Sequence, residues 1–152
     1  MGSTFDYTQA ERQRDINAGL YNALVIPDVI ADMEVSISAE TSEVITVTCA
    51  VVDADGNNIA KRHVVQLQLF TDDDYDTLIS ALAGITYAAT TGTKLPAAFT
   101  TTSNVDMKFL TDADGDLVFT ITDGSAGTEG AALGFFLAND IFIEGGEFLF
   151  GA

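Results

Sequence analysis

The pattern of apolar and polar positions has a period of two over most of the chain. From Met33 onward, the two kinds of residue alternate in short segments separated by turn-forming residues. Such alternation places apolar side chains on one face of a β-strand and polar ones on the other. The alternating segments are 33–37, 45–51, 65–69, 105–109, 117–121 and 133–137, and the apolar stretches 141–143 and 147–150 add a strand or a hairpin. Seven to nine short strands indicate an antiparallel sandwich or barrel, and of the two we predict an all-β sandwich.

The parity of the apolar positions predicts the hydrophobic core. Within each predicted strand these positions share odd numbers, so each set lies on one face. A shift of one residue in strand pairing would expose a whole set, which makes the register strongly specified. The predicted core residues are Val35, Ile37, Ile45, Val47, Cys49, Val51, Val65, Leu67, Leu69, Met107, Phe109, Leu117, Phe119, Ile121, Leu133, Phe135 and Leu137.

Two identical Asp-Ala-Asp-Gly segments, residues 53–56 and 112–115, separate predicted strands. Each ends in Asp-Gly, the pair that supplies the positive φ a tight turn needs. Asn139-Asp140 and Gly145-Gly146 are two further turn candidates. The alternating carboxylates also raise the alternative of a calcium site. An EF-hand loop, however, needs Gly at its sixth position and Glu at its twelfth, whereas here Gly is fourth, so turn chemistry is favoured.

Helical patterns are confined to two places. Residues 8–11, Thr-Gln-Ala-Glu, fit a capping box, and behind them Ile16, Leu20 and Leu24 recur every four residues until Pro27. We therefore expect a helical arm over residues 1–30 and a sandwich domain over 31–152. The arm either packs on its own domain or docks on a neighbouring subunit.

The second helical pattern lies inside the predicted domain. Three aspartates precede Tyr75 to Leu82, and acidic residues at a helix start stabilise its free N–H groups and dipole. Leu78, Ile79 and Leu82 form an apolar stripe, so we expect a small helical insertion over 75–82. The following stretch, 84–104, is rich in Thr, Ala and Gly and is predicted to be a long surface loop with room for a short strand.

Composition narrows the class of protein. The chain has 152 residues with 6 Lys+Arg against 23 Asp+Glu, a net charge of −17, and 47% hydrophobic residues. The length suits one domain, and the apolar fraction excludes wholesale disorder. The negative charge argues against nucleic acid and anionic membrane surfaces as partners. No apolar run approaches the ~18 residues of a membrane span, and the first residues do not resemble a signal peptide.

Candidate catalytic and metal-binding residues all have simpler interpretations. Cys49 has inward parity, which predicts a buried, inert thiol. His63 lies at a strand start with no second histidine in the chain, and Ser125 lies in Gly-Ser-Ala-Gly, which is not a nucleophile elbow. Asp72, Asp73, Asp74 and Asp76 are interpreted as a solvated, helix-capping run. We therefore predict no enzyme activity, no catalytic residue, no cofactor and no bound metal.

A family resemblance rests on two strand-and-turn stretches. They read ITVTCAVVDADGNNIAKRHVVQLQLF, from Ile45 to Phe70, and LTDADGDLVFTITDGSAGT, from Leu110 to Thr128. Both resemble bacterial and phage immunoglobulin-like domains, and the resemblance extends over residues 25–140. The stretch ALVIPDVIADMEVSISAE, from Ala23 to Glu40, resembles small virion proteins of tailed phages. The resemblance implies an immunoglobulin-like sandwich and brings no catalytic residues.

The resemblance also implies a role. We expect a non-enzymatic virion structural protein made in the host cytoplasm. The first hypothesis is a capsid decoration (cement) protein on the outer head surface, because a surface at −17 is repelled by packaged DNA. Its partners would be the major capsid protein or another virion protein, and it would be a homo-oligomer. The alternatives are a head-fibre, tail or neck component, or a receptor- or glycan-binding adhesion module.

Each hypothesis predicts its own contact residues. Apolar surface left over by a fold marks an interface. For the decoration protein, the apolar residues before the first strand and at the chain end are the predicted interface: Ile16, Leu20, Tyr21, Leu24, Val25, Ile26, Phe148 and Phe150. An adhesion module would instead use exposed aromatic residues on loops, for which Tyr87 and Phe99 are the candidates.

Overall fold

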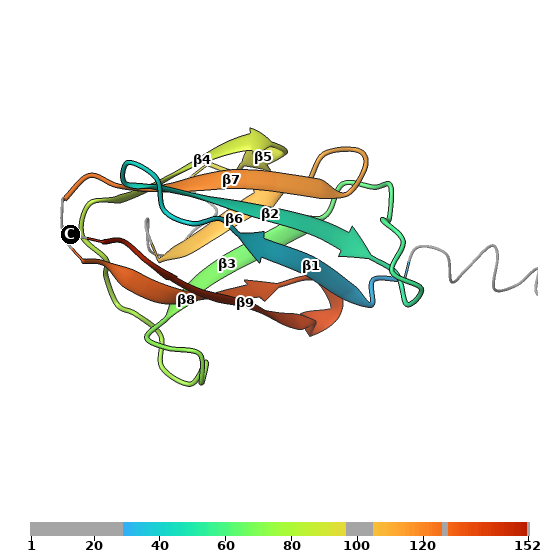
Figure 1. The fold of residues 1–152 in the computed structure, drawn as a ribbon. Helices are drawn as coiled ribbons and strands as arrows, with labels where there is room; N and C mark the ends of the chain where they lie inside the picture. Colours follow the sequence, from blue (N-terminus) through green and yellow to red (C-terminus); the bar gives the residue numbers. More distant parts are fainter. Residues whose placement is uncertain (1–28, 97–104, 126–127, 152) are drawn as a thin grey trace, which may run out of the picture.

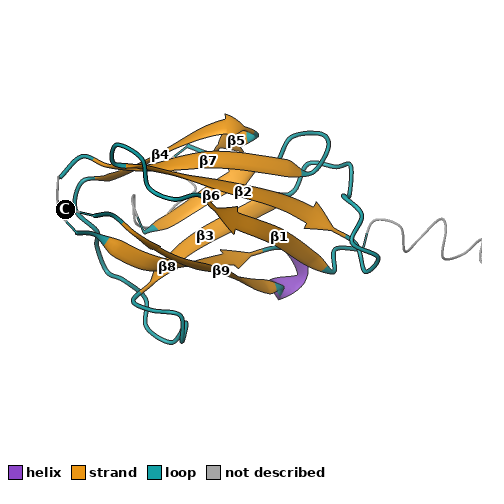
Figure 2. Cartoon of the chain, in the orientation of Figure 1, coloured by secondary structure: helices purple, strands orange, loops and turns teal. Residues whose placement is uncertain are grey.

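Strands in two antiparallel sheets account for almost all the regular structure in residues 29–96, 105–125 and 128–151, the residues described by the computed structural model (Figure 1). The strands are β1 (Asp32–Ile37), β2 (Val44–Val52), β3 (Val64–Phe70), β4 (Ile85–Thr91), β5 (Thr93–Lys94), β6 (Asp106–Leu110), β7 (Asp116–Asp123), β8 (Gly130–Phe136) and β9 (Phe142–Leu149). The one helical element in these ranges is the short 3₁₀ turn Ala138–Asp140, between β8 and β9 (Figure 2). The all-β prediction is confirmed.

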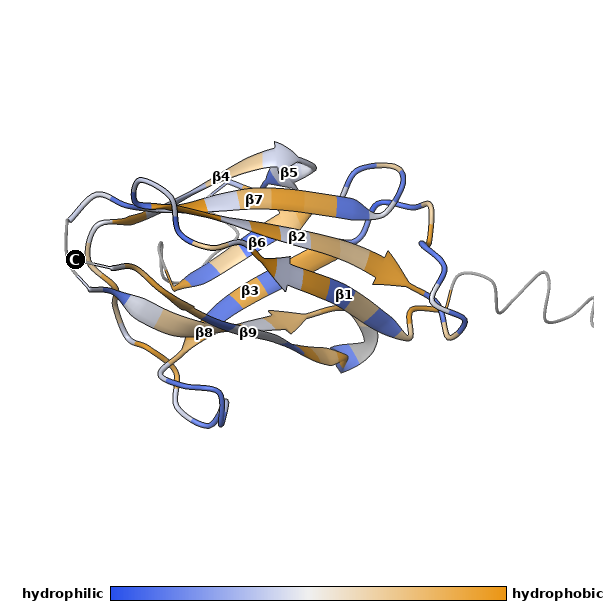
Figure 3. Cartoon of the chain, viewed as in Figure 1, coloured by the Kyte–Doolittle hydropathy of each residue, from blue (hydrophilic) through white to orange (hydrophobic). Residues whose placement is uncertain are grey.

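The two sheets form a β-sandwich. One sheet has four strands in the order β1-β2-β7-β4, and the other has five in the order β5-β6-β3-β8-β9. Every pairing is antiparallel. Strands β1 and β9, one from each sheet, lie side by side along one edge of the sandwich (Figure 1). The buried apolar residues of both sheets form one hydrophobic core, and Figure 3 shows hydrophobic and hydrophilic segments along the strands by their colour.

The parity prediction of the core is confirmed for every residue except Val35 and Ile37, which are half-buried. Both lie on β1, which pairs only with β2 and is an edge strand of its sheet. Phe119 of β7 is at the centre of the core. Its ring stacks on that of Phe109 at a centroid distance of 4.6 Å and meets Phe135 edge-on at 6.4 Å. These contacts join strands of the two sheets, and aromatic pairs of this kind contribute beyond their buried area.

The expectation over residues 84–104 allowed for a short strand, but it is wrong in taking the first part of the stretch as mainly a surface loop. Residues Ile85–Thr91 form β4, which pairs with β7. Ile85 and Tyr87 point into the core, and Thr86 and Ala88 are exposed. The alternation is present but is carried by small residues and threonines, and threonine favours strands because its branched side chain fits a pleated surface. Residues 97–104 lie outside the described ranges.

The small helix expected over residues 75–82 is also wrong. The chain leaves β3 and returns to it: the N–H of Thr71 donates to the carbonyl of Thr77 at 2.9 Å, and the N–H of Ile79 donates to the carbonyl of Leu69 at 3.0 Å. Tyr75 has a positive φ of 53°, which is incompatible with a right-handed helix at that position. Leu78 is exposed while Leu82 is buried, so the stripe does not face one partner.

Both Asp-Ala-Asp-Gly segments are turns that connect strands, as predicted, and they have the same geometry. In each, the Oδ1 atom of the first aspartate accepts hydrogen bonds of 2.9 to 3.0 Å from the backbone N–H groups two and four residues later. Gly56 and Gly115 have φ values of +80° and +85°. Because these turns connect β2 to β3 and β6 to β7, each carries the chain from one sheet to the other.

The two remaining turn candidates differ in outcome. Asn139-Asp140 forms the turn between the paired strands β8 and β9, with Asp140 at a φ of 59°. Gly145-Gly146 is not a turn but a β-bulge within β9. The register moves from Leu133 paired with Gly146 to Gly134 paired with Glu144, so that Gly145 is the extra residue. Glycine suits a bulge because it adopts positive φ without strain, and Gly146 has a φ of +94°.

The N-terminal helical arm was predicted over residues 1–30, and residues 1–28 lie outside the described ranges. The described chain begins at Val29, three residues before β1, so the first strand starts close to the predicted domain boundary at residue 31.

Candidate functional site

An aromatic cluster covers part of the outer face of the five-stranded sheet. The rings of Phe70, Tyr75 and Phe142 meet edge-to-face, with centroid distances of 5.5, 5.9 and 5.6 Å and interplanar angles of 67° to 75°. Phe136 joins them through Phe142 at 5.0 Å. The cluster forms because Phe70 ends β3 on the face opposite Leu69, and because Phe136 and Phe142 are directly paired across β8 and β9.

Gly134 allows the rings to lie directly on the sheet. This residue is in the middle of β8, and a Cβ atom there would lie 2.4 Å from Cε2 of Phe70 and 2.8 Å from Cε2 of Phe142. Both distances are shorter than a non-bonded carbon contact permits. The absence of a side chain at Gly134 is therefore a condition for the aromatic cluster.

Tyr75 fixes the loop between β3 and β4 on this face. Its hydroxyl oxygen accepts a hydrogen bond of 2.9 Å from the backbone N–H of Gly146 in the bulge of β9. The ring is half-buried, and the residue has the positive φ noted above. A non-glycine residue in that conformation is held there by its surroundings. The hydrogen bond and the ring contacts with Phe70 and Phe142 supply that constraint.

Acidic residues lie in the two segments that hold Tyr75. The loop contributes the exposed residues Asp72, Asp73, Asp74 and Asp76, and β9 contributes Glu144 and Glu147. Partial burial raises the pKa of Tyr75, and the negative charges of Glu144, Asp73 and Glu147 raise it further, while the hydrogen bond from Gly146 opposes them. The three carboxylates thus act on one ring from two segments that are distant in sequence. The loop is strongly hydrophilic in Figure 3, where it extends beyond β8.

Apolar side chains remain exposed next to these acidic residues. Phe142 is 36% exposed, and Leu78, at the end of the loop, is 54% exposed. The outer face of the four-stranded sheet is different in kind. It carries mainly small polar residues, Ser36, Thr46, Thr48, Thr86, Thr120 and Thr122. The aromatic and acidic face of the five-stranded sheet is therefore the candidate functional site.

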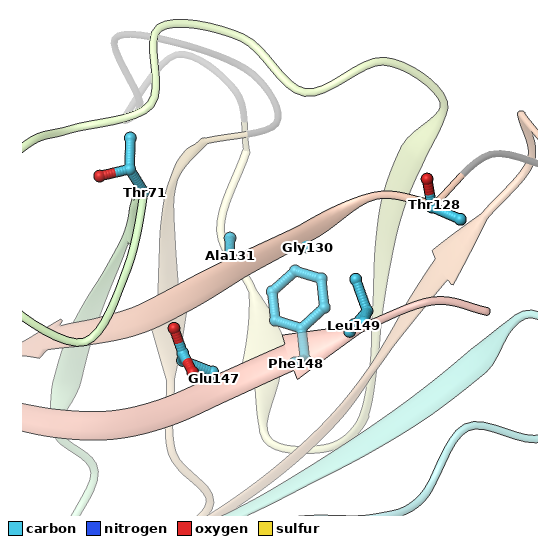
Figure 4. Close-up of a pocket in the computed structure, with 7 residues that line it drawn as sticks. All are labelled: Thr71, Thr128, Gly130, Ala131, Glu147, Phe148 and Leu149. Carbon is cyan, nitrogen blue, oxygen red and sulfur yellow. The ribbon is translucent and has the colours of Figure 1, made fainter.

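A pocket of about 460 Å³ lies beside this face, where β8 begins and β9 ends (Figure 4). Thr71 lines it from the loop after β3, and Glu147 and Leu149 line it from β9. Glu147 is also one of the carboxylates that act on Tyr75. The pocket therefore extends the candidate site toward the chain end.

The interface predicted at the chain end assumed that the fold leaves Phe148 and Phe150 exposed, and this assumption is wrong. Phe148 is 5% exposed and Phe150 is fully buried, and their rings pack edge-to-face at 5.7 Å. Both rings are used inside the fold, because β9 turns its odd positions outward after the Gly145 bulge. The exposed residue of this end is Leu149, at 66%.

The other predicted interface residues, Ile16, Leu20, Tyr21, Leu24, Val25 and Ile26, lie outside the described part of the chain. The first described residue, Val29, is half exposed, whereas Ile30 packs on the core. Tyr87, one of the two aromatic candidates for an adhesion module, is buried in β4, which contradicts its expected exposure on a loop. Phe99, the other candidate, is not among the described residues.

The residues considered for catalysis are found in structural roles. Burial raises the pKa of the Cys49 thiol from 9.0 to about 12, in agreement with a buried, inert side chain. His63 immediately precedes β3, and its backbone N–H donates to Oγ1 of Thr111 at 2.8 Å. Ser125 donates its hydroxyl to Oδ1 of Asp123 at 2.6 Å, next to the chain turn after β7.

Across residues 29–96, 105–125 and 128–151, no three His, Cys, Asp or Glu side chains come together in a group that could hold a metal ion. Within the same ranges, no helix has the length and apolar character needed to span a bilayer.

Comparison with known protein families, curated proteins and solved structures finds no match to this chain. The class of the protein is given by its fold, a β-sandwich of two antiparallel sheets.

The candidate site was not predicted from the sequence, although a signal for it exists. Phe70 follows Gln66 and Gln68 at even positions, where the alternation of β3 places residues that face solvent. Phe136 and Phe142 break the alternation in the same way. Large aromatic residues at positions that the alternation predicts to be solvent-exposed would have indicated a second apolar surface.

Proposed function

We propose that this protein is a non-enzymatic structural protein of a tailed-phage virion, and specifically a capsid decoration (cement) protein on the outer head surface. The domain that carries this role is proposed to be an immunoglobulin-like sandwich. In such sandwiches one sheet has the strand order A-B-E-D and the other contains C-F-G. The orders β1-β2-β7-β4 and β3-β8-β9 correspond to these when β1 is taken as strand A and β9 as strand G. This correspondence supports the family resemblance seen in the sequence.

One part of the topology departs from that scheme. Strands β5 and β6 extend the five-stranded sheet beside β3, where variable-type immunoglobulin domains carry additional strands. In this chain, however, they follow β4 instead of preceding it. The departure concerns an edge of the sheet and leaves the pairing of β3 with β8, and of β8 with β9, unchanged.

The observation that carries the binding role is the exposed apolar surface on the five-stranded sheet. Phe142 is exposed and contacts the half-buried Tyr75, and the exposed Leu78 is bridged to Phe70, on a protein that is otherwise strongly acidic. Contiguous apolar surface with a polar rim marks a protein interaction site. The net charge of −17 supports an outward location, because packaged DNA repels an acidic surface.

The proposed partners are the major capsid protein or another virion protein, together with further copies of this chain in a homo-oligomer. The N-terminal arm, with Ile16, Leu20, Tyr21, Leu24, Val25 and Ile26, is proposed as the anchor. Burying a large apolar side chain contributes about 1.5–3 kcal/mol before the cost of association. If copies are joined, many identical lattice sites add avidity.

The alternative functions remain distinguishable from this one. A head-fibre, tail or neck component would use the same sandwich with its contacts in loops. A receptor- or glycan-binding adhesion module has less support from the structure than from the sequence, because Tyr87 is buried and cannot serve as an exposed loop aromatic. The first function is therefore the one we propose.

The test is to delete residues 1–28 and to measure occupancy on phage particles that lack the protein. A thermal unfolding curve first establishes that the shortened chain folds. A matched pair of full-length variants then separates the apolar stripe from the rest of the arm: Ile16→Ser with Leu20→Ser and Leu24→Ser, against Gln13→Ser with Asn17→Ser and Asn22→Ser.

We expect the deletion and the apolar variant to lose particle binding and the polar variant to keep it. A folded, shortened chain that binds particles as well as the full chain would show that the arm is not the anchor. A full chain that binds no particles would contradict the virion role as a whole.

A further inference from the structure

We propose that the aromatic cluster on the five-stranded sheet and the carboxylates around it bind a basic segment of another protein. The segment presents an Arg or Lys side chain to the rings of Tyr75 and Phe142, where Glu144, Glu147 and Asp73 of the loop pair with its charge. We call this surface the aromatic–acidic face. It consists of Phe70, Tyr75, Phe136, Phe142, Asp73, Glu144 and Glu147.

The aromatic half of the face offers what a cation needs. A guanidinium or ammonium group within about 6 Å of an aromatic ring centre is attracted by the negative ring face. Phe142 is exposed and Tyr75 is half-buried, so both rings are accessible from solvent. The rings are also held in place, since they contact each other and Phe70, and the Tyr75 hydroxyl is bonded to Gly146. A rigid surface loses little conformational entropy when it binds.

The acidic half adds charge complementarity at the same point. Glu144 and Glu147 come from β9 and Asp73 from the loop, and the charges of all three act on the Tyr75 ring. An isolated exposed ion pair contributes little, typically 0 to about 1 kcal/mol. Several carboxylates around an apolar platform do more, because the cation contacts rings and carboxylates together and Arg can pair in a bidentate manner.

The basic residues described in this chain do not belong to the acidic part of the face. Between His63 and Thr93, and again from Phe109 to the end of the sequence, the chain contains no Lys or Arg. Lys108 and Phe136 line one pocket of about 290 Å³ together with Gln66, so this lysine lies at the Phe136 edge of the face. Lys94 donates a hydrogen bond of 3.4 Å to the carbonyl of Tyr87 in the other sheet. A cation that contacts Tyr75 and Phe142 is therefore proposed to come from another molecule.

Charge also selects the occupant. A second copy of this chain carries the same net charge of −17, so long-range electrostatics oppose its approach. Residues 1–28 contain Arg12 and Arg14, but they also contain Asp6, Glu11, Asp15 and Asp28 and are acidic overall. A basic segment of a different protein is the occupant that fits. The inference rests on the proposed function only in assuming a protein partner, and it names the chemistry of that partner.

The experiment uses the full chain and a defined probe. A capped peptide of three Arg-Ala repeats is titrated into the isotope-labelled protein and followed by two-dimensional NMR, with a peptide in which citrulline replaces arginine as the neutral control. We expect the arginine peptide to shift the backbone amides of Tyr75, Phe142, Glu144 and Gly146. The citrulline peptide is expected to leave them unchanged.

Two sets of variants locate the interaction. Glu144→Gln with Glu147→Gln removes two charges from the face, whereas Asp32→Asn with Glu34→Gln removes two charges from the exposed side of β1 in the other sheet. Both pairs have the same net charge. Phe142→Leu keeps an apolar side chain and removes the ring. We expect the face pair and Phe142→Leu each to weaken peptide binding about fivefold, and the β1 pair to weaken it less than twofold.

Several results would overturn the inference. Equal weakening by the two charge pairs would show general attraction to an acidic protein. Shifts that map away from the face, or equal binding of the citrulline peptide, would exclude a cation site. Binding that tightens when residues 1–28 are deleted would identify the chain's own arm as the occupant instead. Loss of particle binding with intact peptide binding would contradict the virion role alone, so the two failures are distinguishable.

Discussion

The hydroxyl oxygen of Tyr75 accepts a hydrogen bond of 2.9 Å from the backbone N–H of Gly146, a residue 71 positions further along the chain. This bond connects the loop after β3 to the bulge in β9. The bulge provides the N–H at that point, because Gly145 is an extra residue in the pairing with β8. The loop thereby packs on the outer face of the sheet, where the charges of Asp73, Glu144 and Glu147 act on the Tyr75 ring.

Replacing Tyr75 with phenylalanine tests the contribution of this bond. The Tyr75→Phe variant keeps the ring contacts with Phe70 and Phe142 and removes only the acceptor. We expect the free energy of unfolding to fall by about 1 kcal/mol. We also expect faster hydrogen exchange of the Gly146 amide in the native state, measured by NMR. Unchanged exchange of that amide would show that the bond does not hold the loop.

A methyl group at Gly134 should disrupt the aromatic cluster. The Gly134→Ala variant places a Cβ atom against Phe70 and Phe142, and both rings must move. Overpacking of this kind typically destabilises a protein by about 1–3 kcal/mol. Gly124→Ala is the matched control, because its nearest neighbour, the carbonyl oxygen of Gly84, is 3.5 Å from the added Cβ. Urea unfolding of both variants measures the difference, and equal stability of the two would contradict the packing described.

Removing the buried hydroxyl of Thr111 should lower the free energy of unfolding. The side chain is fully buried, and its Oγ1 accepts a hydrogen bond of 2.8 Å from the N–H of His63 and lies 3.2 Å from the carbonyl of Lys61, to which it donates. In Thr111→Val the N–H of His63 loses its acceptor, which costs about 1–3 kcal/mol of unfolding free energy. The same substitution at the exposed Thr90 should change stability by less than about 0.5 kcal/mol. Similar losses at both sites would argue against this role of the hydroxyl.

The buried thiol of Cys49 predicts a loss of stability in alkaline solution. Its pKa is raised by burial from 9.0 to about 12, so between these values the folded state retains a proton that the unfolded state has released. The contribution is fully present below pH 9 and is lost as pH rises toward 12, at up to about 1.4 kcal/mol per pH unit. In Cys49→Ala, unfolding by urea from pH 8 to pH 11 should show a shallower decline. Parallel declines in the two proteins would mean that the thiol does not titrate in this way.

The core could be predicted from sequence because its residues obey a single rule. Val47, Cys49 and Phe119 lie at alternate positions of their strands, and burial of one face of each sheet fixes their side. The rule failed where other interactions decided the structure. β4 was missed because its inward residues are few and its outward ones are Thr and Ala. Phe148 and Phe150 were assigned to an interface because the apolar chain end holds more large side chains than a terminal strand was expected to cover, whereas both rings pack in the core.

The candidate site could not be predicted from the periodicity of apolar residues, for a related reason. It depends on contacts between segments that are distant in sequence: the loop at Tyr75, the middle of β8 at Gly134 and the start of β9 at Phe142. The aspartates before Tyr75 predicted a helix start, but the same residues also favour local turns through side-chain acceptors. Oδ1 of Asp72 accepts the N–H of Asp74 at 3.2 Å. Tertiary packing of the Tyr75 ring selects the turn.

The central claim is that the protein is on the outside of the phage head. The most direct measurement is immunogold electron microscopy of intact, DNA-filled virions, with antibodies against the sandwich domain and with virions lacking the protein as the control. The account predicts label distributed over the outer surface of the heads of intact particles. Label that appears only after the heads are opened, that is confined to the tail, or that is absent from purified virions would contradict it.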